Sequence, residues 1–303
     1  MIMNPINFYD VIIVGGGPAG LTAGIYTARA GAKTLVLEKD TVGGNIALSP
    51  SVKNIPGFEE ISGGDFSFEL YEQCMEAGAV LFLEEVKELF NRPPYIKVLT
   101  DKDLYAAKTV ILAVGTTHRH LEVPGEEELL GERIHFCATC DGPFYTDKTV
   151  AVIGGGNSAV TEAKALAKIC KKVIILQNLP SLTADKAEIK ELENCGNIEI
   201  ITNFSVGSFK KTPDGKVLIQ GTSNVVVDGI FLAVGLVPNN QRFSKNLLLN
   251  DAGFAVSGLY SNLFLAGDCK DTPLKQVVTA CASGAEAAVK AVRYLDEHGY
   301  IQQ

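Results

Sequence analysis

Short apolar runs, each followed by glycines, are the most regular pattern along the chain. Residues 11–14 form one such run, and the segment GGGPAG leads from it into residues 21–30, a stretch of apolar and small residues that suits a helix. A second apolar run follows at residues 34–37. A strand, a helix and a second strand in this order predict a βαβ unit with parallel strands.

The same order returns in the middle of the chain. Residues 150–153 are apolar, GGGNSA follows, a helical stretch continues to Lys168, and residues 173–176 are apolar again. In addition, residues 109–115 read TVILAVG and residues 229–235 read GIFLAVG, so each is an apolar strand that ends in glycine. The sequence therefore predicts the α/β class, with two Rossmann-like dinucleotide-binding domains.

The end of the chain indicates how these two domains are connected. A last apolar strand at residues 263–266 is followed by Gly267 and Asp268, a pair that suits flavin binding, so we expect the C-terminus to return to the first domain. Turn residues at positions 124–125 and 238–240 mark the expected linkers. The expected division is an FAD-binding domain of residues 1–116 and 244–303, interrupted by a nicotinamide-type domain of residues 117–243.

Composition excludes two classes of partner. The formal charge is −8 and the pI is near 5.2, so the chain lacks the basic surface that binding to nucleic acid or anionic lipid requires. Residues 11–28 carry no charge over a length that raises a membrane span, but glycines and Pro18 would break its helix. The first nine residues lack a secretory signal, and seven scattered cysteines fit a reducing compartment. We expect a cytoplasmic protein.

The first glycine motif has the residues that a dinucleotide requires. Gly15 permits the tight turn, Gly17 lets the backbone approach a pyrophosphate, and Gly20 allows the helix to pack closely on the strand. The helix N-terminus then offers free N–H groups to the phosphates. Glu38, at the end of the next strand, is placed to accept hydrogen bonds from a ribose.

The second glycine motif leaves its ligand open. Gly154, Gly156 and Ala159 keep the same geometry, but Gln177 stands where an acid would bind the ribose of NAD. Residues 177–184 hold no Arg or Lys that would neutralise the 2′-phosphate of NADP. The fold is expected to be intact, whereas its nucleotide is not identified.

Two of the seven cysteines have the spacing of a redox pair. Cys137 and Cys140 are three residues apart, which allows a small disulfide ring, and an adjacent helix N-terminus would lower the pKa of a thiol. No second closely spaced pair supplies a zinc site, so we expect no metal. The other cysteines are expected to be buried thiols, and His118 and His120 to lie in a solvated linker without a role; those cysteines are Cys74, Cys170, Cys195, Cys269 and Cys281.

With two βαβ units, CATCD at residues 137–141 and AGDC at residues 266–269, the chain resembles the low-molecular-weight thioredoxin reductases from about residue 8 to residue 296. The resemblance implies a homodimer with non-covalently bound FAD and a disulfide in the inserted domain. It implies cofactor contacts from Gly15, Gly17, Pro18, Ala19, Gly20, Glu38, Lys39, Gly43, Gly44, Asn45, Asn54, Ala113, Gly115, Gly267, Asp268, Lys275, Gln276 and Val277. Lys275 stands where the family usually has Arg.

The same resemblance implies catalytic roles. Cys140 would face the flavin, Cys137 would attack thioredoxin, and Asp141 would donate or accept a proton nearby. Reduced flavin would reduce the disulfide, the Cys137 thiolate would form a mixed disulfide with thioredoxin, and Cys140 would resolve it. A domain rotation would let the pair meet the flavin and then the substrate.

The chain departs from the family where the family binds NADPH. The motif HRRxxxR is replaced by QNLPSLT at residues 177–183, and GHxPN appears with Leu236 in place of its His. This pattern resembles the ferredoxin-dependent flavin thioredoxin reductases of clostridia, so we expect ferredoxin or flavodoxin as donor. Acidic ferredoxin would need basic residues, for which the candidates are Lys164, Lys168, Lys171 and Lys172.

Three alternatives stay open at this point. The same cysteines would serve a thioredoxin reductase that uses NADH, or NADPH weakly. An oxygen-dependent dithiol oxidase would also lack the nicotinamide determinants, and a flavin-loaded redox sensor would bind FAD without turning over a disulfide.

Overall fold

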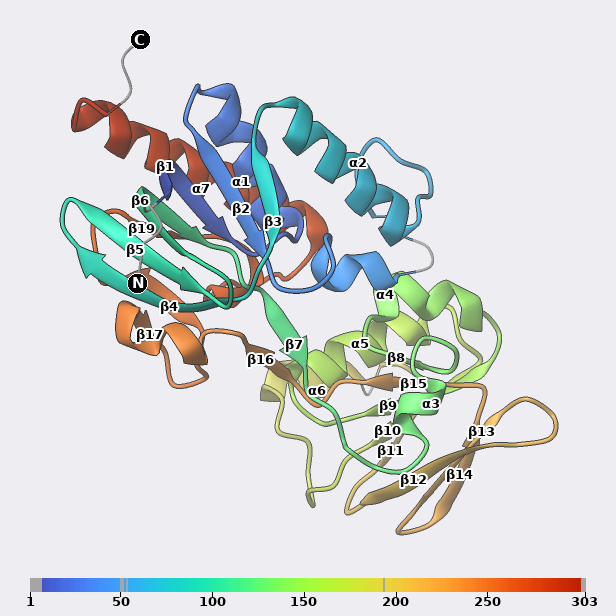
Figure 1. The fold of residues 1–303 in the computed structure, drawn as a ribbon. Helices are drawn as coiled ribbons and strands as arrows, with labels where there is room; N and C mark the ends of the chain where they lie inside the picture. Colours follow the sequence, from blue (N-terminus) through green and yellow to red (C-terminus); the bar gives the residue numbers. More distant parts are fainter. Residues whose placement is uncertain (1–6, 50–51, 53, 193, 301–303) are drawn as a thin grey trace. The chain divides into compact units, whose positions relative to one another are not determined.

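The computed structural model describes residues 7–49, 52, 54–192 and 194–300. Residues 1–6, most of the segment searched for a secretory signal, lie outside the described residues. The chain divides into two compact units (Figure 1). The first contains the described residues up to Thr117 and those from Val237 onward, and the second contains His118–Leu236.

The first unit is built on a mixed sheet with strand order β3-β2-β1-β6-β5-β4, in which β19 also pairs with β6. Strands β1, β2, β3 and β19 join parallel to their neighbours, and β4, β5 and β6 form an antiparallel meander. The strands are β1 (Asn7–Val14), β2 (Thr34–Glu38), β3 (Val80–Leu83), β4 (Val86–Arg92), β5 (Tyr95–Thr100), β6 (Leu104–Leu112) and β19 (Leu263–Leu265), with a separate hairpin of β17 (Leu247–Leu249) and β18 (Ala255–Gly258).

Helices of the first unit bury one face of this sheet. They are α1 (Pro18–Arg29), α2 (Gly63–Glu76) and α7 (Val277–Glu297). The unit also contains the short 3-10 helices η1 (Gly44–Leu48), η3 (Gln241–Asn246) and η4 (Gly267–Cys269). Val11 and Ile13 of β1 pack in the core that α1 and α7 share, whereas Ile12 and Val14 pack in the core on the meander side. Because both faces of β1 are covered, its apolar run is continuous rather than alternating.

The second unit repeats the architecture on a smaller scale. Its parallel sheet has the order β11-β10-β9-β15-β8, and a three-stranded antiparallel sheet, β12-β13-β14, belongs to the same unit. The strands are β8 (Ile134–His135), β9 (Thr149–Ile153), β10 (Lys172–Leu176), β11 (Ile198–Ile201), β12 (Val206–Lys211), β13 (Val217–Gly221), β14 (Asn224–Val227) and β15 (Gly229–Leu232). The helices are α3 (Glu126–Leu129), α4 (Ala138–Asp141), η2 (Gly142–Tyr145), α5 (Asn157–Ala167) and α6 (Lys186–Leu192).

Two cores cover the faces of the second parallel sheet. Val150 and Val152 of β9 pack with residues of α5, whereas Ala151 and Ile153 pack with Phe209 of β12. Both glycine motifs therefore follow the first strand of a βαβ unit, as the sequence predicts. The two connections between the units are β7 (Thr116–His118) and β16 (Leu236–Pro238), which pair with each other.

One expected linker, at residues 124–125, and one expected boundary differ from this division, whereas the linker expected at residues 238–240 directly follows the change of unit at Val237. Gly125 lies inside the second unit, where it precedes α3 with φ +83°, and a Cβ there would overlap the backbone of Phe209. The return to the first unit comes at Val237 rather than at residue 244. The reason is η3, whose Phe243 is buried in the core on the meander side of the first unit and whose Asn246 side chain donates to the Leu89 carbonyl at 3.2 Å.

Candidate active site

The first glycine turn leaves room for a ligand. Gly15 has φ +111°, and a Cβ there would overlap the Ala113 carbonyl; a Cβ at Gly20 would overlap the Gly15 carbonyl. These two positions need glycine for the fold itself. At Gly17, by contrast, a Cβ would meet no protein atom closer than 3.8 Å. The protein does not require glycine there, so the open backbone in front of α1 fits a phosphate group.

Glu38 connects the end of β2 to this turn by a hydrogen bond. Its Oε2 accepts the Gly16 N–H at 2.6 Å and its Oε1 accepts the Asp40 N–H at 3.0 Å, and the residue is buried. A carboxylate has about four lone-pair sites, so two of them stay open for ribose hydroxyls. Lys39 is exposed and lies 3.7 Å from the Asp40 carboxylate.

The segment from Gly43 to Asn45 lies beside the same turn. Gly43 and Gly44 have φ +106° and +59°, and the Gly43 N–H donates to the Gly16 carbonyl at 2.8 Å. Asn45 donates through its amide to the Thr116 carbonyl at 2.9 Å, just beyond the end of β6. These bonds place Gly43–Asn45 and the exit of β6 around the first glycine turn.

The C-terminal candidates surround η4 and the start of α7. Gln276 caps α7 in a capping box with Thr279, and its side-chain oxygen accepts from the Asn54 amide at 3.0 Å; Val277 is the first residue of the helix. Gly267 has φ +73°, and a Cβ there would come within 2.8 Å of the Ala19 Cβ. Gly267, Ala19 and the first glycine turn are therefore neighbours.

Asp268 and Lys275 differ in whether their charged side-chain groups are hydrogen-bonded within the protein. Lys275 donates to the carbonyls of Asp268 and Lys270 at 2.9 and 3.0 Å and lies 4.2 Å from the Phe254 ring centroid. Burial raises the pKa of Asp268, and among the described residues its carboxylate accepts no hydrogen bond. The Asp268 carboxylate can thus accept a hydrogen bond from a cofactor hydroxyl, whereas the Lys275 ammonium is hydrogen-bonded to carbonyl groups of its own loop.

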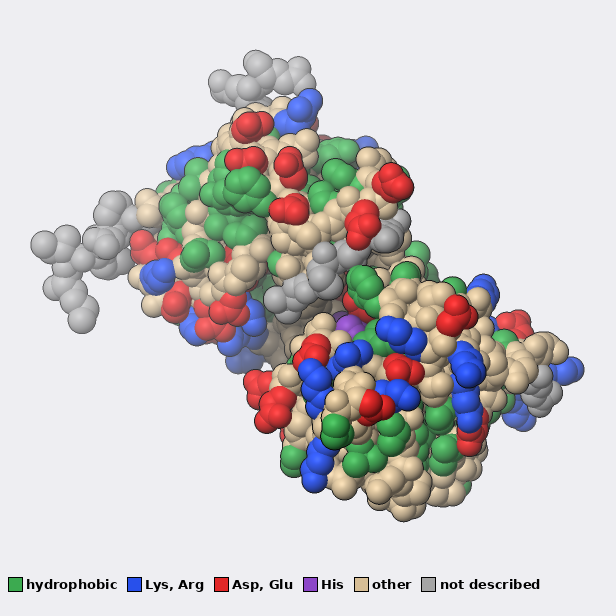
Figure 2. Space-filling model, turned by 90° about the vertical axis from the view of Figure 1, so that its right-hand side faces the viewer, with side chains coloured by type: hydrophobic (Ala, Val, Ile, Leu, Met, Phe, Trp, Pro, Cys, Tyr) green, Lys and Arg blue, Asp and Glu red, His purple; other side chains and the backbone are tan. Residues whose placement is uncertain are grey.

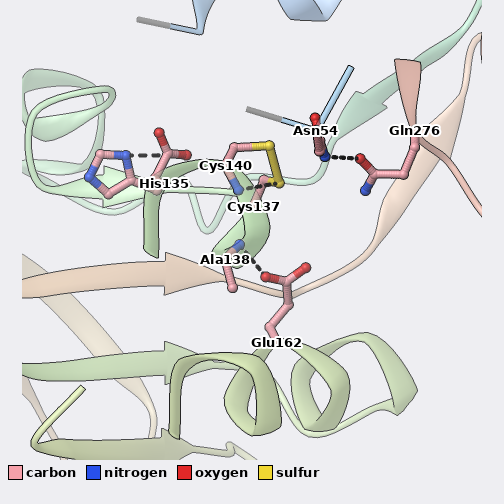
Figure 3. The surroundings of a disulfide bond; sticks show 8 residues. Asn54, His135, Cys137, Ala138, Cys140, Glu162 and Gln276 are labelled. Atoms are coloured by element: carbon pink, nitrogen blue, oxygen red, sulfur yellow. Dashed lines mark hydrogen bonds and ion pairs between the residues drawn. A yellow bond between two sulfur atoms is a disulfide. The ribbon is translucent and has the colours of Figure 1, made fainter. Parts of the chain in front are cut away.

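Cys137 and Cys140 form a disulfide within a single helical turn (Figure 3). Their Cα atoms are 5.3 Å apart, and Cys137 is the N-cap of α4, with its Sγ accepting the Cys140 N–H at 3.2 Å. Both cysteines are partly exposed, and Thr139 between them is exposed. A thiolate at Cys137 would keep this N–H donor, which favours the charged form.

Asp141 is buried directly after the disulfide. Burial raises its pKa to about 6. His135 of β8 lies with Nδ1 3.6 Å from the Asp141 carboxylate, too far for a hydrogen bond, and its Nε2 pairs with the Tyr145 hydroxyl at 2.8 Å. Burial lowers the pKa of His135 to about 4, so the imidazole is neutral at pH 7. The contact is a neutral imidazole beside a carboxyl group rather than an ion pair.

Three side chains around this turn were missed in the sequence: His135, Tyr145 and Glu162. The Ala138 N–H donates to the Glu162 carboxylate, which reaches across from α5 (Figure 3). A signal for Glu162 was available, because it stands three residues after Ala159 and next to Ala163, on a helix whose other inward positions are apolar. His135 and Tyr145 carry no sequence pattern that distinguishes them from core residues.

The second glycine turn has the same backbone arrangement as the first, but no carboxylate takes the place of Glu38. Gly154 has φ +134°, and a Cβ there would overlap the Ala233 carbonyl. Gln177 is buried where Glu38 stands in the first unit, and its amide serves its own loop: the oxygen accepts the Asn178 N–H at 3.1 Å and the nitrogen donates to the Ser181 carbonyl at 3.4 Å. No cation is present in residues 177–183.

Several secondary expectations need correction. Cys74, Cys170 and Cys269 are buried, but Cys195 and Cys281 are partly exposed. His118 is only partly exposed: it stacks on Phe136 with ring centroids 4.2 Å apart, and burial lowers its pKa to about 4. His120 is exposed, as expected, and pairs with buried Glu126 at 2.9 Å.

Within the described part of the chain, no group of His, Cys, Asp or Glu side chains could hold a metal ion. Nor does any helix found there have the length and apolar character to cross a membrane.

Two dinucleotide folds and a CxxC disulfide define a flavin-type disulfide oxidoreductase, and comparison with known proteins agrees. Residues 9–284 match the family model described as pyridine nucleotide-disulphide oxidoreductase. Thioredoxin reductase from Listeria monocytogenes is 35% identical over 301 residues, 95% of this chain and 94% of that protein. Thioredoxin reductase from Bacillus subtilis is 33% identical over 97% of both chains.

Solved structures agree with the fold. Thioredoxin reductase from Streptococcus pyogenes superposes with a TM-score of 0.88 at 31% identity, covering 97% of this chain and all of that one. The enzyme from Giardia duodenalis gives 0.87 at 30%, covering 96% and 99%. The chain therefore belongs to the low-molecular-weight thioredoxin reductase family. Members of this family are FAD flavoproteins, and the open turn at Gly17, with Glu38 and Asp268, fits that cofactor.

Proposed function

We propose that this chain is a flavin-dependent reductase of thioredoxin disulfides, with ferredoxin or flavodoxin rather than NADPH as electron donor. The reductase activity is supported above all by the Cys137–Cys140 disulfide, which closes within one helical turn directly before buried Asp141. Membership of the family supports thioredoxin as substrate. FAD, when bound, supplies the electron pair that opens the disulfide.

The protein's own residues then handle thiols and protons. Opening the disulfide takes two electrons and two protons and leaves a dithiol. Asp141, whose pKa burial raises to about 6, can hold one of these protons next to Cys140. The Cys137 thiolate attacks the thioredoxin disulfide, a mixed disulfide forms, and Cys140 displaces the reduced thioredoxin, which restores the Cys137–Cys140 bond. This order of the two cysteines is the one that the family resemblance implies.

The donor proposal rests on the loop after β10. NADPH sites use an Arg fork on the 2′-phosphate, a charge-assisted contact, and residues 177–183 offer no cation. The side chain of Gln177 is bonded to its own loop. The intact turn at Gly154 keeps an NADH-fed reductase as the second candidate.

The basic surface proposed for ferredoxin is smaller than the sequence suggests. Lys164 pairs with Glu188 and Glu191 at 2.5 and 2.7 Å, and Lys172 pairs with Glu199 at 2.6 Å. Lys168 and Lys171 are exposed and have no ion pair within the described residues, and the Lys171 N–H donates to the carbonyl of exposed Lys148. Figure 2 shows Lys and Arg side chains interspersed with Asp and Glu over the second unit. We propose that Lys148, Lys168 and Lys171 form the docking surface.

The test is anaerobic reduction of the bound flavin, followed spectroscopically, with NADPH, NADH and reduced ferredoxin offered separately in the presence of oxidised thioredoxin. We expect fast bleaching and thioredoxin reduction with ferredoxin alone. The variant Lys168→Glu/Lys171→Glu should slow this step about tenfold at low salt, while the matched control Lys210→Glu, on β12, leaves it unchanged. Efficient bleaching by either nicotinamide would contradict the donor proposal, and oxygen uptake with dithiols would indicate an oxidase.

We also propose that the chain acts as a cytoplasmic homodimer. Large apolar side chains are exposed on the three helices of the first unit, namely Tyr26 on α1, Phe68 on α2 and Val289 on α7. Such surfaces commonly mark protein interfaces. Light scattering during gel filtration would measure the mass directly, and a monomeric mass at micromolar concentration would contradict this proposal.

A further inference from the structure

Glu162 connects the helix of the second dinucleotide fold to the disulfide turn. Its carboxylate accepts the N–H of Ala138, the residue directly after Cys137 (Figure 3). The side chain comes from α5, which follows the second glycine turn, and it is partly buried. This carboxylate takes no part in the proposed reductase mechanism.

The groups around the turn do not neutralise this carboxylate. Burial raises the pKa of Glu162, the hydrogen bond from the Ala138 N–H opposes this rise, and the charge of Asp141 on α4 adds to it. His135 on β8 lies 3.6 Å from Asp141 and is neutral at pH 7 because burial lowers its pKa to about 4. The positive charge of Arg133 also lowers the pKa of His135, and among the described residues Arg133 forms no ion pair with Glu162. Within the described residues, no cation pairs with Glu162 or Asp141.

The carboxylate also decides which N–H groups a thiolate can use. The Cys140 N–H donates to the Cys137 Sγ at 3.2 Å, but the Ala138 N–H is bound to Glu162 and is not available to sulfur. The Glu162 carboxylate binds the N–H of the residue that follows Cys137. Its negative charge therefore opposes the formation of a second negative charge on the Cys137 sulfur. A thiolate that is harder to form makes the dithiol less stable relative to the disulfide.

We propose that Glu162 is a positioning residue that keeps the Cys137 thiol a weaker acid, and the disulfide a weaker oxidant, than the turn alone would make them. The inference rests on the proposed reductase function for its biological meaning, because a weakly oxidising pair passes its electrons readily to thioredoxin. Its physical content, the acidity of one thiol, is measured without turnover.

The test replaces the charge and keeps the hydrogen bond. In Glu162→Gln the side-chain oxygen still accepts the Ala138 N–H. The holoprotein is reduced with dithiothreitol and alkylated with iodoacetamide between about pH 5 and pH 10, and the modification of Cys137 is quantified by mass spectrometry. We expect the alkylation midpoint to fall by about half to one pH unit, which is about three to ten times more thiolate below the midpoint. At about pH 8 the equilibrium constant for reduction of the disulfide should rise several-fold. A tenfold rise corresponds to an increase of about 30 mV in the reduction potential.

Two further variants separate charge from structure. Glu199→Gln removes an acid on β11, at the opposite edge of the sheet from β8, and should leave the midpoint unchanged. Glu162→Ala removes both charge and bond and should shift the midpoint in the same direction as Glu162→Gln. An unshifted Glu162→Gln beside a shifted Glu162→Ala would overturn the inference, because only the bond would then matter. Failure of the wild-type protein to reduce thioredoxin would reject the proposed function and leave the thiol measurement standing.

Discussion

Asp141 shows at the scale of a residue how burial changes the acidity of a carboxyl group. Its side chain is 12% exposed, and its pKa rises from 3.8 to about 6 because burial disfavours the charged form. Between these values the folded protein binds more protons at this site than the unfolded chain does. Stability therefore falls as pH rises from about 4 to 6, and the full cost of the buried charge is present above pH 6.

Replacing Asp141 with Asn is expected to make the oxidised protein more stable at neutral pH. The reason is that the amide carries no charge to desolvate, and the gain at pH 7 should be on the order of 2 kcal/mol. At about pH 4 the variant and the wild type should differ little, because the carboxyl is then largely protonated in the folded state. Thermal unfolding at the two pH values measures the difference, and equal gains at both would contradict the prediction. Thioredoxin reduction by the variant should be slower despite its higher stability.

At the scale of elements, the contact between α1 and α7 fixes the positions of the first glycine turn and of the segment before α7, which hold candidate FAD contacts. Gly284 of α7 faces the backbone of Ala19 in α1, where a Cβ would overlap the carbonyl of Ala19. The same α1 begins at the first glycine turn, and the same α7 begins at Gln276. Close helix packing thus fixes the distance between two groups of residues that are far apart in the sequence.

Gly284→Ala should separate these helices and destabilise the first unit by about 1–3 kcal/mol, the usual cost of overpacking. We expect earlier release of the flavin on heating, measured by the rise of flavin fluorescence. Gly64→Ala is the matched control: it also lies in a helix of the first unit, but its Cβ would have no neighbour closer than 3.8 Å. If the two variants release flavin at the same temperature, the packing argument is wrong.

At the scale of the whole molecule, the two units have separate cores. The core residues of the second unit come only from within His118–Leu236, and they cover both faces of its parallel sheet. The two ends of this segment belong to the paired strands β7 and β16, so its termini are close together. Inserted domains with close ends and their own core commonly fold alone.

We predict that a fragment of residues 118–236 folds by itself, forms the Cys137–Cys140 disulfide and binds no FAD. Circular dichroism, thiol titration and absorbance check these three points. A fragment with the boundaries expected from the sequence, residues 117–243, adds Phe243, whose side chain packs in the first unit. It should be no more stable than the shorter fragment. An unfolded shorter fragment would mean that the second unit depends on the first.

Much of the molecule could be predicted because its signals are local. The apolar runs with glycine turns defined both βαβ units, since the turn conformations at Gly15 and Gly154 exclude other residues. The spacing of Cys137 and Cys140 was enough to predict the disulfide, because two sulfurs three residues apart meet within one helical turn. The fold class and the family follow from these features alone.

The rest required residues that meet only through the tertiary structure. The boundary at Val237 depends on Phe243 reaching a core formed by strands about 150 positions earlier in the chain. His135 of β8 meets the Tyr145 hydroxyl of η2 and the Asp141 carboxylate only in the folded second unit, and Glu162 reaches the same turn from α5. Local sequence determined the turns and the disulfide, whereas burial, which sets the acidity of the groups around it, is a property of the assembled cores.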